Sequence, residues 1–270
     1  MKLSGKVALV TGVSPNIGGG IVEELWAAGA RIVTVDANAE NAEDCANYIN
    51  SNGGEALAIQ CDVTDEAQVA ATVAQAVEHF GSVDILVNNA AFFNQKGVLD
   101  MSYGEWQAQT GVILDGAFLF TKYVAQAMID TQRAGCIINI ISTAGHQGQP
   151  GNVAYSTSKM GLMNFTNSVA MELASRGIRV NSLTPTATDP SEAVERARRW
   201  GRDVSADPKM EALMVQFSDH VPMKKLPKPS DYGKAAVFLA SDDAAMITGT
   251  DLRVDAGAVS KYWAWDPAKG

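Results

Sequence analysis

The sequence predicts an α/β protein built on a doubly wound, parallel sheet of seven strands. Short apolar runs alternate with helical patterns along all 270 residues, at the spacing of βα units. A glycine-rich turn follows the first run at once and opens a helix. The distinctive polar motifs come directly after predicted strands, where parallel sheets bind ligands. Because no linker divides the chain, we expect one domain over residues 1–270.

Seven segments, most of them short apolar runs, are interpreted as strands. They are Lys6–Val10, Arg31–Val35, Glu55–Gln60, Val83–Val87, Cys136–Ile141, Ile178–Leu183 and Asp251–Val254. The helical segments place apolar residues three or four apart, as Val69, Val73 and Val77 illustrate. They are Gly18–Ala28, Asn38–Asn52, Asp65–Phe80, Tyr103–Ile129, a helix carrying Tyr155 and Lys159, and Tyr232–Ala240.

The overall composition excludes several classes of protein. A net charge of −9 and a pI of about 4.8 argue against a nucleic-acid-binding protein. No run approaches about 18 consecutive apolar residues, and the first residues lack the apolar core of a signal peptide. Cys45, Cys61 and Cys136 are scattered, so neither a disulfide framework nor a metal site is expected. We therefore expect no membrane span and a reducing, cytoplasmic location.

The turn after the first strand, Thr11–Gly20, has the context of a dinucleotide-binding fingerprint of the Rossmann type. Gly12 permits a tight turn, and Gly18 lets the backbone approach a pyrophosphate. Free N–H groups at the start of the next helix favour an anion there. The alternative is an ordinary βα turn without a ligand.

Asp36 stands at the end of the second strand, where a carboxylate can accept both hydroxyls of an adenine ribose. Its charge would repel a 2′-phosphate, and Ser14, Pro15 and Ala37 supply no positive charge to attract one. These residues favour NAD over NADP. The alternative is that Asp36 only caps the next helix.

Ser142, Tyr155 and Lys159 form the predicted catalytic group. Ser142 follows the fifth strand, and Tyr155 and Lys159 share one helix face because they are four residues apart. An ammonium about 4 Å from the phenol would favour the phenolate by about 4 kcal/mol and lower the pKa of Tyr155 by up to about three. Tyr155 would then act as general acid/base, with Ser142 bonding the same substrate oxygen. By itself, however, a Tyr-x-x-x-Lys spacing also suits an ordinary helix surface.

The long polar segment at about 187–229 is expected to form a substrate loop or lid. Its arginines are Arg196, Arg198, Arg199 and Arg202. We interpret them as a solvated, charged helix face, with a site for an anionic substrate group as the alternative.

Taken together, these residues resemble the short-chain dehydrogenase/reductase family over essentially the whole chain. The match lies in the order and spacing of its motifs. They are Thr11-Gly12 to Ile17-Gly18, Asp62-Val63, Asn88-Asn89-Ala90, Ser142, Tyr155, Lys159 and Asp255-Ala256-Gly257. The resemblance implies NAD as cofactor. The contacts that it implies are Gly12, Asn16, Ile17, Gly18, Asp36, Asp62, Val63, Asn89, Ala90, Tyr155, Lys159 and Thr188.

The sequence departs from the family pattern at several positions. Asn16 takes the place of a glycine, which is tolerable because Asn can adopt a left-handed backbone. Ala91 and Thr186 each replace a family Gly, and Pro190 replaces a Thr. Ile113 falls where the family carries an Asn that orders a proton-relay water near the lysine. Ile113 cannot order that water, so either the relay runs differently or turnover is impaired.

The leading hypothesis is an oxidoreductase that transfers a hydride between a secondary alcohol or ketone and NAD. One alternative is a cofactor-binding relative with little or no turnover, a sensor or assembly subunit, which Ile113 supports. Another is a 3-oxoacyl-type reductase, which Asp36 opposes because biosynthetic reductions commonly use NADPH. The family implies a homo-oligomer, a tetramer by preference. The aromatic tail, residues 258–270, is expected to pack across a subunit boundary or back on its own subunit.

Overall fold

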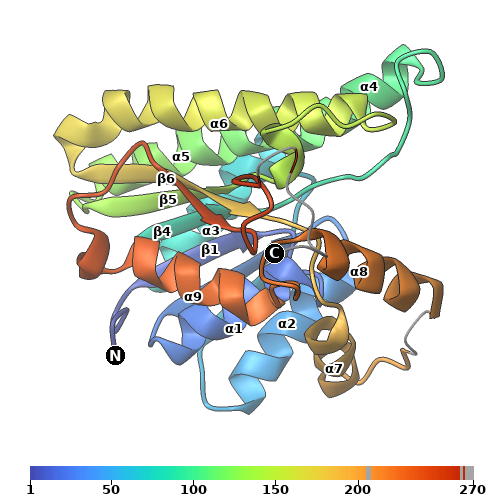
Figure 1. Ribbon diagram of the computed structural model, residues 1–270. Helices are drawn as coiled ribbons and strands as arrows, with labels where there is room; N and C mark the ends of the chain where they lie inside the picture. Colours follow the sequence, from blue (N-terminus) through green and yellow to red (C-terminus); the bar gives the residue numbers. More distant parts are fainter. Residues whose placement is uncertain (205–207, 262–263, 265–270) are drawn as a thin grey trace.

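The computed structural model of the chain describes residues 1–204, 208–261 and 264. One sheet of seven parallel strands runs through its middle, in the order β3-β2-β1-β4-β5-β6-β7, with helices on both faces (Figure 1). The predicted fold class is therefore confirmed. The hypothesis about the aromatic side chains Tyr262, Trp263 and Trp265 lies outside the described residues.

The strands agree with the predicted runs to within two residues at each end. They are β1 Val7–Thr11, β2 Arg31–Asp36, β3 Ala56–Gln60, β4 Ile85–Asn88, β5 Gly135–Ile140, β6 Ile178–Pro185 and β7 Asp251–Val254. The α-helices among the described residues are α1 Ile17–Ala27, α2 Ala39–Ser51, α3 Glu66–Phe80, α4 Tyr103–Thr110, α5 Gly116–Asp130, α6 Val153–Leu173, α7 Ser191–Arg199, α8 Pro208–His220 and α9 Pro229–Ala240.

The strand order reverses at the centre of the sheet, and this places the site. β1 pairs with β2 on one side and with β4 on the other, so the chain winds outward in both directions from β1. A sheet of this kind leaves a crevice beyond the carboxyl ends of the two strands at the reversal. The glycine-rich turn after β1 and the asparagines at the end of β4 meet there.

The two faces of the sheet are both covered by helices, because successive side chains of each strand point to opposite faces. Ala8 and Val10 of β1 belong to a core shared with α1, α2 and α9. Val7 and Leu9 belong to a second core shared with α3, α5 and α6. All four side chains are fully buried. With both faces covered, the ends of the strands are the part of the sheet left for a ligand.

The segment predicted as one helix over residues 103–129 is interrupted. α4 and α5 are joined by a π-helical turn, η1 Gly111–Asp115, in which Ile113 is buried. A π turn rotates the helix faces on its two sides relative to each other. By length and composition alone, the stretch Tyr103–Asp130 is apolar enough to cross a membrane, and half of its apolar window is buried inside the protein. The buried half of this window serves the core.

The predicted lid segment contains α7 and α8, and two of its four arginines do not lie on a solvated face. Arg196 is 2% exposed and pairs with Glu23 of α1, while Arg202 pairs with Asp44 of α2. The interpretation as a solvated face is therefore wrong for these two arginines, whereas Arg198 and Arg199 are exposed as it predicted. Its error has a physical cause, because the carboxylates that neutralise these arginines lie far away in the sequence.

Three consecutive glycines, Gly18–Gly20, begin α1, and two of them make room for later helices. A Cβ atom on Gly19 would lie 2.8 Å from Cδ of Arg196 in α7. One on Gly20 would lie 2.5 Å from Cβ of Pro229 in α9. The start of α1 is therefore a point at which segments from both halves of the chain converge.

We predict that Gly20→Ala lowers the free energy of unfolding by about 1–3 kcal/mol, the usual cost of overpacking. The backbone carbonyl carbon of Pro229 would lie 2.7 Å from the new methyl group and cannot rotate away. Urea unfolding measures the change. Gly104→Ala is the matched control, because open space surrounds that exposed helical position, and it should stabilise by about 0.5–1 kcal/mol. A Gly20→Ala variant as stable as the control would contradict the packing described.

Candidate active site

The glycine-rich turn after β1 depends on glycine at two places. Gly12 has a φ of +72°, in the left-handed region that glycine adopts at little cost. A Cβ atom on Gly18 would overlap the carbonyl oxygen of Gly12. Asn16 has a φ of −81°, so it does not use the left-handed conformation that we expected of it. The turn therefore accommodates Asn16 without a positive φ angle.

Asn89, directly after β4, fixes this turn. Its side-chain amide donates to the carbonyl of Gly12 at 2.6 Å and to the carbonyl of Thr11 at 3.2 Å. In return, the hydroxyl of Thr11 accepts from the backbone N–H groups of Asn89 and Ala90, both at 3.1 Å. The carboxyl ends of β1 and β4 are thus joined by side chains, and the turn is held in shape before any ligand arrives.

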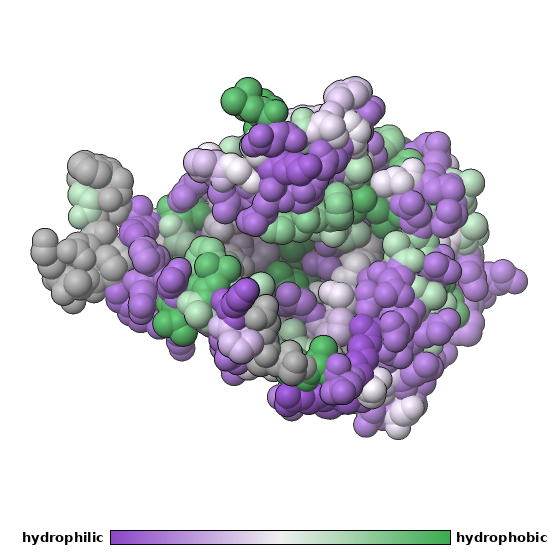
Figure 2. Space-filling model, turned by 90° about the vertical axis from the view of Figure 1, so that its right-hand side faces the viewer, coloured by the Kyte–Doolittle hydropathy of each residue, from purple (hydrophilic) through white to green (hydrophobic). Residues whose placement is uncertain are grey.

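A cavity of about 360 Å³ opens beside this turn. Nine predicted cofactor contacts line it, namely Gly12, Asn16, Ile17, Gly18, Asp36, Asp62, Val63, Asn89 and Ala90. Figure 2 shows the molecule from the side that carries α8 in Figure 1, with a central hollow bordered by both hydrophobic and polar residues. The structure therefore brings these nine residues together, and their contact with a cofactor stays a prediction.

Asp36 is half-buried at the end of β2 and accepts the backbone N–H of Asn38 at 2.9 Å. The N-cap of α2 is Asn38, whose side chain accepts from the N–H of Glu40. The alternative that Asp36 itself caps the helix is therefore wrong. A carboxylate has about four acceptor positions, so Asp36 can also accept from the hydroxyls of a ribose.

Ser142 and Tyr155 meet where β5 ends and α6 begins. Both residues are half-buried, and the Ser142 hydroxyl lies close enough to the Tyr155 phenol to oppose the rise in its pKa. Gly145 lies in the loop between them, and a Cβ atom there would be 2.9 Å from the backbone carbon of Lys159. The loop therefore packs directly on α6, which sets the position of Ser142 relative to the helix.

Lys159 is fully enclosed, and its Nζ donates to the carbonyl of Ile140 at 2.6 Å. The same Nζ lies 5.5 Å from the centre of the Tyr155 ring. Burial lowers the pKa of Lys159 to about 7. Burial also raises the pKa of the Tyr155 phenol, and the nearby Ser142 hydroxyl offsets part of that rise.

The expected lowering of the Tyr155 pKa is therefore wrong for the cofactor-free protein. The Coulomb argument assumed a fully charged ammonium close to the phenol oxygen. In the structure, the lysine amine is bound to a backbone carbonyl and is itself poorly solvated. Desolvation of the phenol dominates, and the proton stays on Tyr155.

Apolar side chains surround the ring of Tyr155. Phe93 packs edge-on against it, with 5.0 Å between the ring centroids, although Phe93 itself is 55% exposed. Tyr155 also packs against a buried cluster of Ile113, Ala117, Ile141 and Leu162. Ile113 therefore supplies packing at the position where the resemblance implies a polar residue. The segment that carries Phe93 begins at Ala91 in the cofactor cavity, so it connects that cavity with Tyr155.

A polar network joins the loop after β5 to the strands β6 and β7. Nε2 of His146 lies 3.0 Å from the hydroxyl of Thr184 and 3.3 Å from a carboxylate oxygen of Asp251. The same carboxylate accepts from the hydroxyls of Thr184 and Ser182, at 2.9 and 2.7 Å. The loop that carries Ser142 is thus held at its far end as well.

Thr188, a predicted cofactor contact, is not among the residues that line the cavity beside the glycine-rich turn. Its hydroxyl donates to the carbonyl of Thr186 and lies 3.1 Å from the hydroxyl of Tyr232 in α9. In this structure Thr188 therefore contacts the last helix. No group of three or more His, Cys, Asp or Glu side chains that could hold a metal occurs in the part of the chain that the structure describes.

The residues that sequence reasoning missed fall into two groups. The first lies beside predicted contacts along the chain, and a search of the residues flanking each motif would have found Ser14, Ala37 and Ala91. The second comes from elements further along, and includes Asn41, Val112, Phe93, His146 and Asp251. No local pattern marks this second group, because only the fold brings its members to the site.

Comparisons with known proteins agree with this geometry. The family model described as Enoyl-(Acyl carrier protein) reductase matches residues 12–259. A 3-oxoacyl-[acyl-carrier-protein] reductase of Synechocystis sp. is 38% identical over 261 residues, which cover 95% of this chain and 98% of that protein. The D-threitol dehydrogenase of Mycolicibacterium smegmatis is 35% identical over 260 residues, covering 96% of this chain and 95% of that protein.

A solved structure is also similar over most of its length. The structure of NAD⁺-bound xylitol dehydrogenase is 34% identical in sequence, with a TM-score of 0.83. The match covers 94% of this chain and 99% of that one.

We predict that Lys159→Met removes part of the pH dependence of stability in the cofactor-free protein. The pKa of Lys159 is about 7 in the folded state and 10.5 ordinarily. Between these values the unfolded chain binds more protons, so the stability of the wild type rises with pH. The wild type should gain about 2 kcal/mol relative to the variant between about pH 7 and 9. Urea unfolding at the two pH values tests this, and parallel pH profiles would contradict a buried lysine of low pKa.

Proposed function

The chain belongs to the short-chain dehydrogenase/reductase family, and from this premise we propose that it interconverts a secondary alcohol and its ketone with NAD as hydride carrier. Its relatives are named dehydrogenases and reductases, and the chain is an oxidoreductase that uses a nicotinamide cofactor and a small-molecule substrate. The observation that carries the proposal is the convergence of Ser142, Tyr155 and Lys159. Phe93 packs on Tyr155 and follows closely on Ala91, which lines the cavity at the glycine-rich turn.

In the proposed mechanism, Tyr155 transfers a proton, and Ser142 and Lys159 assist that transfer. The bound nicotinamide supplies or accepts the hydride. Tyr155 keeps its proton because burial raises its pKa, so the phenol is ready to donate to a carbonyl oxygen during reduction. The Ser142 hydroxyl, which lies near the phenol, donates to the same oxygen. Lys159, when protonated, stabilises the phenolate left behind.

The residues around the cavity fit a dinucleotide. The turn from Gly12 to Gly18 leaves room for a pyrophosphate at the N-terminus of α1, where backbone N–H groups favour an anion. Asp36 is proposed to accept the ribose hydroxyls, and Asp62 and Val63 to contact the adenine. The single carboxylate of Asp36 supports NAD over NADP, because a 2′-phosphate would meet a like charge.

A second candidate is the reduction of a ketone carried on an acyl carrier protein. The 38% identity to a 3-oxoacyl-[acyl-carrier-protein] reductase favours it. Asp36 opposes it, because biosynthetic reductions commonly draw on NADPH. A cofactor-oxidation assay with a 3-oxoacyl thioester, run beside a panel of simple ketones, separates the two candidates.

We also propose that the protein is a homo-oligomer, most simply a tetramer, in a reducing cytoplasm. Large apolar side chains are exposed on α5 and α6, among them Phe118, Met160 and Met171. A second copy would remove this surface from water. Light scattering would measure the assembly state. The free, buried thiols of the three cysteines are compatible with a reducing compartment.

We predict that Tyr155→Phe lowers kcat by about 10²–10⁴-fold, the usual contribution of a general acid. The dissociation constant of NAD should stay within about twofold, since the change removes one hydroxyl from a position outside the cavity that holds the turn. Tyr123→Phe is the matched control, because its hydroxyl donates to Glu66 at an exposed position on the surface. Substantial turnover in Tyr155→Phe would overturn the assigned role.

We predict that the wild type binds NAD more tightly than NADP. Asp36→Ala should reduce the ratio of the two dissociation constants by roughly tenfold. The substitution removes the like charge that faces the 2′-phosphate. Calorimetry with both cofactors gives the ratio of dissociation constants. Glu40→Ala removes a nearby carboxylate that does not line the cavity and should leave the ratio unchanged. Equal affinities in the wild type would rule out the selection by Asp36.

A further inference from the structure

α7 is attached to the glycine-rich turn by a buried arginine. Arg196 has the largest of the fully buried side chains among the described residues. Its Nη1 donates to the carbonyl of Pro15 at 2.8 Å, and its Nη2 donates to the carboxylate of Glu23 at 3.0 Å. Pro15 lies between Ser14 and Asn16, which both line the cofactor cavity. Arg196 therefore holds the turn through a residue that does not itself line the cavity.

A second arginine holds another part of the cavity wall. Arg202, just after α7, donates from Nη1 to the side-chain oxygen of Asn41 at 2.9 Å and from Nε to Asp44 at 2.8 Å. Asn41 lines the cavity together with Asp36 and Ala37. Because a guanidinium can only donate, it engages the Asn41 oxygen and leaves the amide N–H groups as the donors for a ligand. Such a donor suits a ribose hydroxyl.

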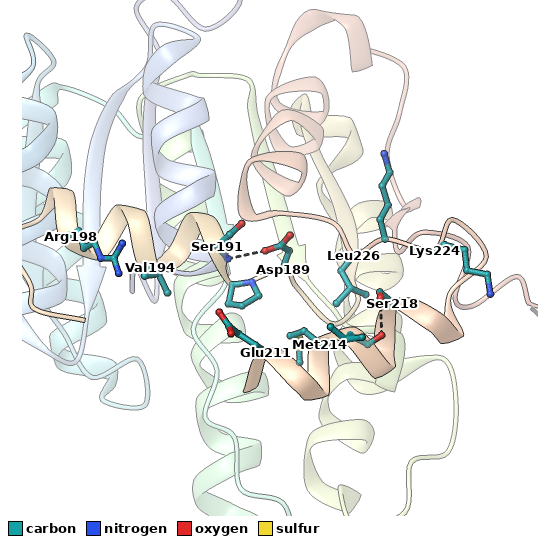
Figure 3. Close-up of a pocket in the computed structure, with 12 residues that line it drawn as sticks. Asp189, Ser191, Val194, Arg198, Glu211, Met214, Ser218, Lys224 and Leu226 are labelled. Atoms are coloured by element: carbon teal, nitrogen blue, oxygen red, sulfur yellow. Dashed lines mark hydrogen bonds between the residues drawn. The ribbon is translucent and has the colours of Figure 1, made fainter. Parts of the chain in front are cut away.

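The other two arginines of α7 show that the helix has two distinct faces. Arg199 donates to the hydroxyl of Tyr48 at 2.7 Å and pairs with Glu23 at 3.1 Å. Arg198 instead bonds the carbonyl of Val204 and lines a cavity of about 550 Å³ between α7 and α8 (Figure 3). One face of α7 is thus committed to α1 and α2, and the other borders the segment expected to act as a lid.

The contact between Arg196 and α1 requires two features that lower stability, one in each helix. Gly19, inside α1, is the residue that leaves space for Arg196, and a glycine within a helix lowers stability. Burying a guanidinium is also unfavourable unless its donors find partners. Both costs fall on the segment that borders the cofactor cavity. An arginine that only made the protein surface more soluble would need neither the glycine in α1 nor the burial of its guanidinium.

We propose that α7 is a positioning element for the cofactor. Arg196 holds the turn from Ser14 to Asn16 in the shape that receives the pyrophosphate, and Arg202 presents Asn41 to the adenosine ribose. The inference rests on the proposed function, in that the ligand is a nicotinamide dinucleotide. Coupling of this kind is reciprocal. Docking of α7 raises the affinity for NAD, and NAD stabilises docked α7 by the same factor.

The first experiment compares three variants by calorimetric titration with NAD. Arg196→Gln and Arg202→Gln should each weaken binding by about tenfold, the effect expected from loss of one charge-assisted hydrogen bond. Arg198→Gln, on the same helix but facing away from the turn, should stay within about twofold of wild type. A folded Arg196→Gln protein with the affinity of the wild type would overturn the inference.

The second experiment needs no substitution, so it decides the question even if Arg196→Gln fails to fold. Hydrogen exchange of the wild type is measured with and without saturating NAD. We expect slower exchange in α7, residues 191–199, and no change in α3, residues 66–80, which serves as the internal reference. Unchanged exchange in α7 would overturn the inference. A wild type that binds neither NAD nor NADP would instead refute the proposed function.

Discussion

The close approach of the β1 turn to the start of α1 is the constraint on which the rest of the structure depends. The carbonyl of Gly12 and the backbone of Gly18 are so near that no side chain fits between them. Asn89 holds the same carbonyl from β4, which ties the turn to the centre of the sheet. Because the helix starts this close to the strand, the backbone N–H groups of its first turn face the crevice and are not covered by a side chain. The cavity, the docking of α7 and the packing of α9 all start from this point.

The fold was accessible from the sequence because its signals are local. A strand covered on both faces is largely apolar, and β1 and β5 were found from that property. The glycine-rich turn was equally readable, since strand, glycines and helix follow one another without interruption. Parallel strands end at one edge, so residues after separate strands, such as Asp36 and Asn89, could be placed together before the structure was known.

The features that could not be predicted depend on distant partners and on burial, and a local sequence pattern contains neither. The charges of Arg196 and Arg202 indicated exposure until the fold placed Glu23 and Asp44 beside them. The Tyr155 pKa moved in the opposite direction to the expected one, because the argument contained the attraction but not the desolvation. The π turn around Ile113 could not be predicted either, because an apolar run shows the same helical spacing with or without an inserted residue.

The contact between Gly19 and Arg196 has a consequence for the evolution of this protein. The space that the guanidinium stem occupies would be filled by any side chain at position 19, whose first carbon would already lie 2.8 Å from it. The backbone carbonyl oxygen of Ser14 lies at the same 2.8 Å, so glycine is needed at position 19 with or without the arginine. Among homologous chains, an arginine at the α7 position should therefore occur together with glycine in α1, whereas the glycine can persist without the arginine. Covariation of this pair would record whether the attachment of α7 was inherited or newly gained.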